Sequence, residues 1–231
     1  MELLQISSRL IQRAIFLAFI LFGLNILSAS NSNAITFGKD VLDGSTKYPS
    51  VVSVWYTEDS EEDYYPICTG TLIEPRIVLT AAHCVLNEGV YAVGYGSDLL
   101  RSAKLQSVSA TWKNPSYSAR QMVNDVGLLL LEKSIPWITP TPLQSSKEIA
   151  SIVSNKKVKL EIVGWGKNQN EEPATYLRMA VVEDQSAIMK KYKGWRNDVW
   201  IAVGKSNKKE KVYAAPVMEI AAGLCLPPRM V

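Results

Sequence analysis

The residues best suited to chemistry gather in one short stretch of this chain. Residues 68–84 contain two of the three cysteines, Cys68 and Cys84, and they also contain His83, the single histidine of the sequence. An imidazole titrates near neutral pH and can act as a general base. The alternative is a buried histidine that packs beside a stapling pair of cysteines. The residue types alone leave both hypotheses open.

Two short strands are predicted to position His83. β-branched residues at 69–72 and 77–80 favour strands, and the Glu-Pro-Arg sequence at 74–76 predicts the turn between them. The second strand ends just before His83, so the ring is expected at the end of a hairpin.

The Thr-Ala-Ala-His-Cys sequence at 80–84, with Cys68 sixteen positions before Cys84, resembles the histidine region of the trypsin/chymotrypsin-like serine proteases. In that family the histidine is the general base and the two cysteines are paired. The resemblance therefore implies that His83 is catalytic. It also implies a disulfide between Cys68 and Cys84, which would fix the imidazole before any substrate arrives.

A second motif resembles the aspartate region of the same family. The Asn-Asp-Val-Gly-Leu-Leu-Leu-Leu sequence at 124–131 is similar to Asn-Asp-Ile-Ala-Leu-Leu-x-Leu, whose aspartate orients the catalytic histidine. The resemblance implies that Asp125 is buried, accepts the Nδ1 proton of His83 and leaves Nε2 facing the nucleophile. An aspartate before a strand is otherwise usually a turn residue. The apolar run after Asp125 predicts a strand buried on both faces.

The remaining pattern predicts an all-β fold. Further strands are expected from β-branched and aromatic residues at 48–56, 90–96, 106–112, 158–166 and 176–183. Three prolines within 134–142 cannot donate to a ladder, which indicates an extended linker between two lobes. The Gly-Trp-Gly sequence at 164–166 resembles the start of the family's second barrel. The expected fold is a two-lobed antiparallel β-barrel of the trypsin-like type, with the first barrel at about 35–140 and an incomplete second barrel at about 150–231.

The beginning of the chain predicts export. Residues 1–34 are interpreted as a signal peptide, because Arg9 and Arg13 precede an apolar run and Ser-Asn-Ala at 32–34 supplies small residues. An uncleaved anchor helix is the alternative, but the run is shorter than the roughly 20 residues that a membrane span needs. Cleavage after Ala34 would make Ile35 the mature N-terminus, similar to the Ile-Val-Gly-Gly start of mature family members. We expect a secreted protein, extracellular or periplasmic, in an oxidising setting.

Composition and charge argue against several other classes of protein. A formal net charge of +3 over 231 residues gives no argument for nucleic-acid binding, and 47% hydrophobic residues argue against disorder. The acidic stretch at 57–63 and the lysine-rich stretch at 190–211 are interpreted as solvated loops, with a calcium loop and a polyanion site as the alternatives. One histidine without a carboxylate cluster is a poor metal-hydrolase site. We expect no metal, no cofactor, no nucleic acid and, after signal cleavage, no membrane association; the expected partners are protein or peptide substrates.

The family pattern breaks at Cys225. Relatives would continue with Cys-x-Gly-Asp-Ser-Gly-Gly-Pro, whereas this sequence reads Cys-Leu-Pro-Pro-Arg-Met-Val at 225–231. The nucleophilic serine and the specificity pocket are therefore expected to be absent, as in a truncated or frame-shifted gene product. The expected function is an exported serine endopeptidase that is inactive in this form. The alternative is a non-catalytic homologue that acts as a binding or interaction module.

Overall fold

The computed structural model describes residues 35, 38–42, 44–58, 64–85, 88–99, 104–121, 123–155, 159–166, 174–184, 201–204, 216–217 and 224–225. The signal peptide expected at 1–34 lies outside these residues, as do the acidic residues 59–63 and most of the lysine-rich stretch at 190–211. Within the described ranges, none of the helices combines the length and the apolar character that crossing a membrane requires.

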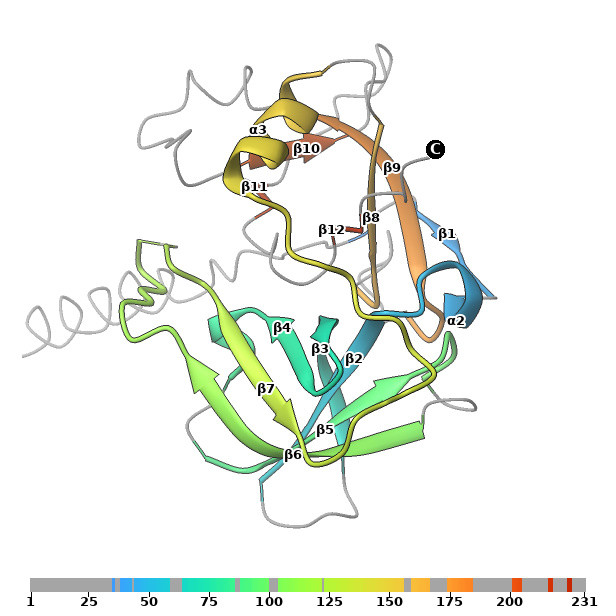
Figure 1. The fold of residues 1–231 in the computed structure, drawn as a ribbon, viewed down its shortest axis with the longest axis vertical. Helices are drawn as coiled ribbons and strands as arrows, with labels where there is room; N and C mark the ends of the chain where they lie inside the picture. The colour runs from blue at the N-terminus through green and yellow to red at the C-terminus, as the bar shows by residue number, and fades with distance from the viewer. Residues whose placement is uncertain are drawn as a thin grey trace, which may run out of the picture. The chain divides into compact units, whose positions relative to one another are not determined.

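Six antiparallel strands close into a barrel (Figure 1), in the order β2-β3-β4-β7-β6-β5. Their bounds are β2 Val51–Thr57, β3 Tyr65–Glu74, β4 Ile77–Thr80, β5 Val90–Tyr95, β6 Lys104–Lys113 and β7 Gly127–Leu131. Each strand has a neighbour on both sides, so the barrel has no open ladder edge. The expected all-β architecture is confirmed.

Alternate side chains of these strands fill the barrel interior. The largest fully buried side chains among them are Val52, Val54, Leu72, Val78, Val93, Leu129 and Leu131. Burying a side chain of this size contributes about 1.5–3 kcal/mol relative to leaving it in water. The segment that follows β7 completes this core with Ile135 and Ile138.

The burial of β7 differs from the sequence prediction. Leu129 and Leu131 are fully buried, but Leu130 is 38% exposed. The prediction of a strand buried on both faces is therefore wrong. A barrel strand has one face toward the core and one toward its surroundings, and here leucines occupy both faces.

Two other barrel strands begin three or four residues away from their predicted starts. β3 begins four residues earlier, at Tyr65, and includes Pro66 next to the point where the β2–β3 register shifts. A proline is tolerated at such an irregularity because no regular ladder bond is needed from it. β2 begins later than predicted, because Tyr48 accepts a backbone hydrogen bond from Val51 and closes a turn.

The second sheet is open in the described residues, as expected for an incomplete second barrel. Its strands run in the order β11-β10-β9-β8-β12, and β1 also pairs with β9. The bounds are β1 Lys39–Asp40, β8 Leu160–Gly164, β9 Arg178–Asp184, β10 Ile201–Gly204, β11 Pro216–Val217 and β12 Leu224–Cys225. A small cluster packs against this sheet, and three of its five buried members come from residues before or at the start of β2: Val41, Tyr48, Val51, Val163 and Leu177.

Three short helices complete the described structure: α2 Gly44–Lys47, the 3-10 helix η1 Ala82–Cys84 and α3 Ser146–Ser154. The sequence prediction did not include α3. Its N-terminus is a capping box, in which Ser145 accepts from the Glu148 backbone N–H and the Glu148 carboxylate accepts from the Ser145 backbone N–H. A Ser-x-x-Glu sequence before an apolar run is a recognised helix start, so this signal was present in the sequence.

Candidate active site

His83 lies in η1, directly after β4, and the barrel holds this turn from two sides. Ala81, Ala82 and Cys84 are buried, while the His83 side chain is 37% exposed. A disulfide joins Cys84 to Cys68 on β3, with the two Cα atoms 6.2 Å apart, which confirms the expected pairing. The covalent bond and the buried neighbours fix the backbone of the turn, so that the ring alone projects from it.

Asp125 lies at the same end of the barrel as His83, just before β7. Since β4 and β7 are paired strands, with Thr80 opposite Gly127, the residues after β4 and before β7 meet at one end of the barrel. Asn124 has a positive φ of 58° and its side-chain amide donates to the Ser116 carbonyl at 2.9 Å. Asparagine tolerates this left-handed conformation better than most residues. The turn at Asn124 directs Asp125 toward η1.

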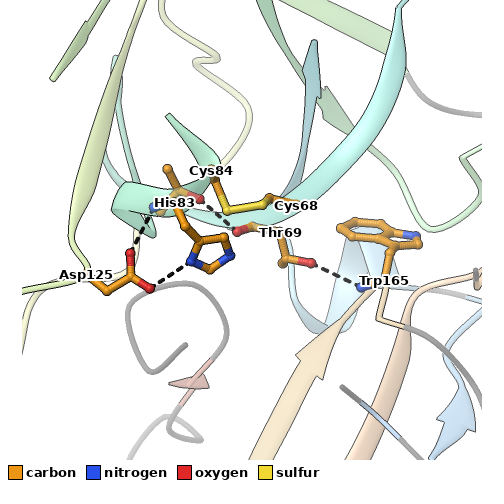
Figure 2. Close-up of a disulfide and its surroundings, with 7 residues drawn as sticks. Cys68, Thr69, His83, Cys84, Asp125 and Trp165 are labelled. Carbon is orange, nitrogen blue, oxygen red and sulfur yellow. Dashed lines mark hydrogen bonds and ion pairs between the residues drawn. A yellow bond between two sulfur atoms is a disulfide. The ribbon is translucent and has the colours of Figure 1, made fainter. Parts of the chain in front are cut away.

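The Asp125 carboxylate holds His83 at two points (Figure 2). Oδ1 accepts from the His83 backbone N–H at 2.9 Å, and Oδ2 lies 2.7 Å from His83 Nδ1. The Asp125 side chain is only 8% exposed. Because an ionised carboxylate can only accept, Nδ1 carries the proton in this pair. In the neutral imidazole Nε2 is then the unprotonated ring nitrogen, the one that can accept a proton.

Tyr117 adds a titratable group beside this pair. Burial raises the pKa of the Tyr117 phenol above its ordinary value of 10.0, and the negative charge of Asp125 raises it further. Its backbone N–H donates to Asn114 in the turn that carries the Asn-Pro-Ser-Tyr sequence. Tyr117 therefore stays protonated and neutral next to the aspartate across the physiological pH range.

The second sheet reaches the same region through Trp165, which directly follows β8. The Trp165 backbone N–H donates to Thr69 Oγ1 at 3.1 Å, and Thr69 adjoins Cys68 of the disulfide. Figure 2 shows Thr69 and Trp165 on one side of the His83 ring and Asp125 on the other. Ninety-six positions separate Thr69 from Trp165. No local sequence pattern signals a contact over that distance.

Three of the expected site residues form a cluster of potential metal ligands. Cys68, His83 and Cys84 bring their ligand atoms within 4.8 Å of one another, a spacing that could suit a metal. The two sulfurs are bonded to each other, so they are not thiolate ligands, and a single imidazole remains. Ile35, the expected mature N-terminus, is 5% exposed, and its carbonyl accepts from the Gly38 backbone N–H.

Comparison with known proteins gives a consistent result. The family model "Trypsin" matches residues 35–211. "Trypsin eta" of Drosophila erecta is 29% identical over 163 residues, which cover 69% of this chain and 62% of that protein. "Chymase" of Mus musculus is 26% identical over 193 residues, covering 80% and 75%. "Kallikrein-7" of Homo sapiens is 37% identical over 112 residues, covering 43% of this chain and 38% of that protein.

A solved structure described as "Structure of GrC" has a TM-score of 0.59 and 20% sequence identity, and the match covers 74% of this chain and 76% of that one. This likeness shows a shared fold. Alignments to the three relatives above cover between 38% and 75% of the relatives' own length. The matched part of this chain therefore spans only part of the length of these relatives.

Proposed function

Because the chain belongs to the trypsin family of serine proteases, peptidase family S1, we propose that His83 and Asp125 are the general base and the orienting carboxylate of a serine endopeptidase. The observation that carries this proposal is the double contact of one carboxylate with the backbone N–H and the Nδ1 of the same histidine. The two contacts fix both the position of the ring and its tautomer. A packed structural histidine does not need a ring exposed by more than a third.

The chemistry assigns a step to each atom of the pair. A hydroxyl oxygen attacks the carbonyl carbon of a peptide bond, a C–O bond forms, and the π electrons move to the carbonyl oxygen. The hydroxyl proton passes to Nε2 of His83, and His83 then delivers it to the leaving amine as the C–N bond breaks. The Asp125 carboxylate stabilises the imidazolium that exists between these two transfers.

This sequence lacks the family motif that would supply the nucleophile for this step. The 231 residues contain no Gly-Asp-Ser-Gly-Gly segment. In the serine-protease mechanism the serine and its neighbouring amides supply the attacking oxygen and the oxyanion hole. The 231-residue polypeptide by itself is therefore proposed to be inactive toward peptide bonds, although it keeps the base and the orienting group.

Export to an oxidising compartment, with proteins or peptides as substrates, belongs to the same proposal. The Cys68–Cys84 disulfide supports it, since such bonds persist outside the reducing cytosol. The names of the relatives, a trypsin, a chymase and a kallikrein, also support a peptidase. The absence of the serine motif favours the second candidate, a non-catalytic homologue that binds partners. The contacts between His83 and Asp125 favour the peptidase origin.

The experiment that tests the catalytic pair uses the single histidine as its own reporter. In ¹⁵N-labelled protein at neutral pH, we expect the proton on Nδ1 and a hydrogen-bonded Nδ1–H resonance. Asp125→Asn should remove that resonance and allow the proton to move to Nε2, the change that lowers kcat about 10⁴-fold in an active triad. Asp40→Asn, at an exposed aspartate in β1, is the matched control and should leave the resonance unchanged.

A peptide-hydrolysis assay tests the proposed inactivity separately. Purified 231-residue protein and its His83→Ala variant should both give the background rate with a mixed quenched-peptide substrate. Cleavage by the parent that His83→Ala abolishes would contradict the proposed inactivity. A proton found on Nε2 in the parent would contradict the catalytic pair itself.

A further inference from the structure

Thr69 joins three segments at the edge of the candidate site. Its Oγ1 accepts the Trp165 backbone N–H of the second sheet at 3.1 Å, and its carbonyl accepts from Thr80 Oγ1 on β4, also at 3.1 Å. The preceding residue, Cys68, is bonded to Cys84. The same threonine therefore contacts the end of β8, the end of β4 and, through the chain, the disulfide that holds the His83 turn.

The spacing between β8 and β3 at this point depends on the Thr69 side chain. A Cβ added to Gly164 would lie 2.8 Å from Thr69 Oγ1, closer than Cβ contacts normally come, and 3.4 Å from both Thr69 Cβ and Cγ2. These three atoms are the nearest neighbours of that position. Gly164 is buried at the end of β8. A glycine here lets the second sheet approach until the Trp165 N–H reaches the threonine hydroxyl.

We propose that Thr69 is a positioning residue: with Gly164 it sets the distance between the Gly-Trp-Gly segment and the His83 turn, and so places the second sheet beside the imidazole on the side away from Asp125. This inference rests on the proposed function, in which Nε2 of His83 must face a reacting group. Asp125, just before β7 of the barrel, orients the ring. Thr69 determines which part of the second sheet lies on the opposite side of the ring. Figure 2 shows this arrangement, with the ring between Asp125 and Thr69.

The chemistry of threonine suits this role in two ways. The hydroxyl oxygen supplies an acceptor for a backbone N–H that lies just past the end of a strand, where the ladder offers none. The branched side chain at Cβ restricts its χ1 rotation, so the oxygen keeps its direction. Valine would keep the shape and lose the acceptor, whereas serine would keep the acceptor and lose the methyl group.

The first experiment compares Thr69→Val with Thr69→Ser in the full chain, using two readouts. Hydrogen exchange of the Trp165 amide reports the bond itself, and the rate of His83 carbethoxylation by diethyl pyrocarbonate reports how closely the imidazole is covered. We expect Thr69→Val to speed both by about fivefold, the factor that corresponds to one net hydrogen bond. Thr69→Ser should restore both rates to within about twofold of the parent, since it keeps the same acceptor.

The matched control is Ser50→Ala, which removes another cross-segment hydroxyl. Ser50 is 3% exposed and its Oγ lies 2.6 Å from Thr141 Oγ1, outside the group around His83. It should leave the carbethoxylation rate unchanged even if it lowers the Tm as much as Thr69→Val. Equal carbethoxylation rates in the parent and Thr69→Val would overturn the proposal, and so would an increase in Ser50→Ala equal to that in Thr69→Val.

A size exchange tests the spacing directly. Gly164→Ala should speed His83 carbethoxylation, because the added methyl forces β8 away from Thr69. Thr69→Ala combined with Gly164→Ala removes the clashing atoms and should bring the Tm above that of Gly164→Ala alone. A double variant no more stable than Gly164→Ala would refute the spacing role. The Nδ1 proton experiment on Asp125→Asn decides the proposed function independently of these rates.

Discussion

The two sheets of this chain are supported in different ways. Every strand of the barrel is bonded on both sides, and its core consists of residues from its own strands, Val85 after η1 and the segment after β7. The second sheet is open in the described residues, and three members of its small buried cluster come from residues 41–51. The barrel can therefore keep its shape from its own contacts, while the second sheet depends on segments that belong to the beginning of the chain.

This difference bears on the candidate site. His83 follows β4 and Asp125 precedes β7, so both lie on the closed barrel and meet through a single pair of strands. The second sheet contributes Trp165, held through Thr69. The base and its orienting carboxylate should therefore survive changes that loosen the second sheet. Loosening of the second sheet would instead alter the surface that faces the imidazole.

The largest expected effect comes from removing matched leucines from the two cores. Leu129 of β7 is fully buried and Leu177 next to β9 is 1% exposed. Either change to alanine should cost about 2–5 kcal/mol in the stability of the region that contains it. In Leu129→Ala the His83 Nδ1–H resonance should weaken as the barrel loosens. In Leu177→Ala that resonance should persist while the amides of β8 and β9 exchange faster.

The comparison fails if the two variants behave alike. Loss of the Nδ1–H resonance in Leu177→Ala at a temperature where β4 and β7 amides remain protected would mean that the second sheet holds the pair in place. Denaturant unfolding followed by both the imidazole resonance and amide exchange would distinguish these outcomes. A single coincident transition in both variants would show that the two sheets unfold as one unit.

A smaller effect is expected at Arg178, which links the start of the chain to the second sheet. Its guanidinium donates to the Gly38 carbonyl at 2.6 Å and pairs with Asp40 at 3.2 Å, and the residue is 9% exposed. Arg178→Met should cost about 1–3 kcal/mol, because the Gly38 carbonyl loses a charged donor. Exchange of amides in β1 and β9 should quicken, while the His83–Asp125 contacts stay intact.

Arg76→Met is the matched control on the barrel. Arg76 Nε donates to the Leu131 carbonyl at 2.8 Å, but Arg76 is exposed, so the loss should be smaller. It should leave β1 and β9 exchange unchanged. If Arg178→Met left β1 as protected as in the parent, the guanidinium would not be what holds this segment against β9.

Sequence reasoning found the elements whose signals are local. Most barrel strands were predicted from β-branched runs, and the turn between β3 and β4 was predicted one residue too long, since Glu74 ends β3 and the turn is at Pro75 and Arg76. The pairing of Cys68 with Cys84 followed from a resemblance that depends on spacing. The burial of β7 was misjudged, because four consecutive leucines give no alternation from which to read that one face points outward.

The remaining features depend on contacts between distant residues. The second sheet packs against Val41, Tyr48 and Val51, and no local sequence pattern around these residues predicts that contact. In the sequence they look like an ordinary segment that leads into a strand. The contact between Thr69 and Trp165 has the same origin. The sequence shows Gly164 as part of the Gly-Trp-Gly motif. The reason for a glycine there, the close approach of β8 to Thr69, appears only in the structure.

The smallest expected effect concerns the titration of Tyr117, and it tests whether the barrel alone sets the electrostatics of the pair. Burial raises the pKa of the Tyr117 phenol and the charge of Asp125 raises it further. Asp125→Asn removes only the second cause, so the phenol should titrate at lower pH than in the parent, yet still above its ordinary value of 10.0. Leu177→Ala should leave the titration in place, because Asp125 and the turn at Tyr117 directly precede β7 of the barrel. The ¹³Cζ shift of labelled tyrosine, assigned with Tyr117→Phe, measures the midpoint.

The direction of the linked stability follows from the sign of this shift. A tyrosine whose pKa is higher in the folded than in the unfolded protein contributes stability that is fully present below the unfolded pKa, about 10. That contribution is lost as the pH rises through the folded pKa. The parent should therefore lose stability above pH 10 more steeply than Tyr117→Phe, which has no phenol to ionise. A Tyr117 midpoint that Asp125→Asn does not move, or that Leu177→Ala lowers as much, would show that the charge acting on this phenol is not that of the barrel's aspartate.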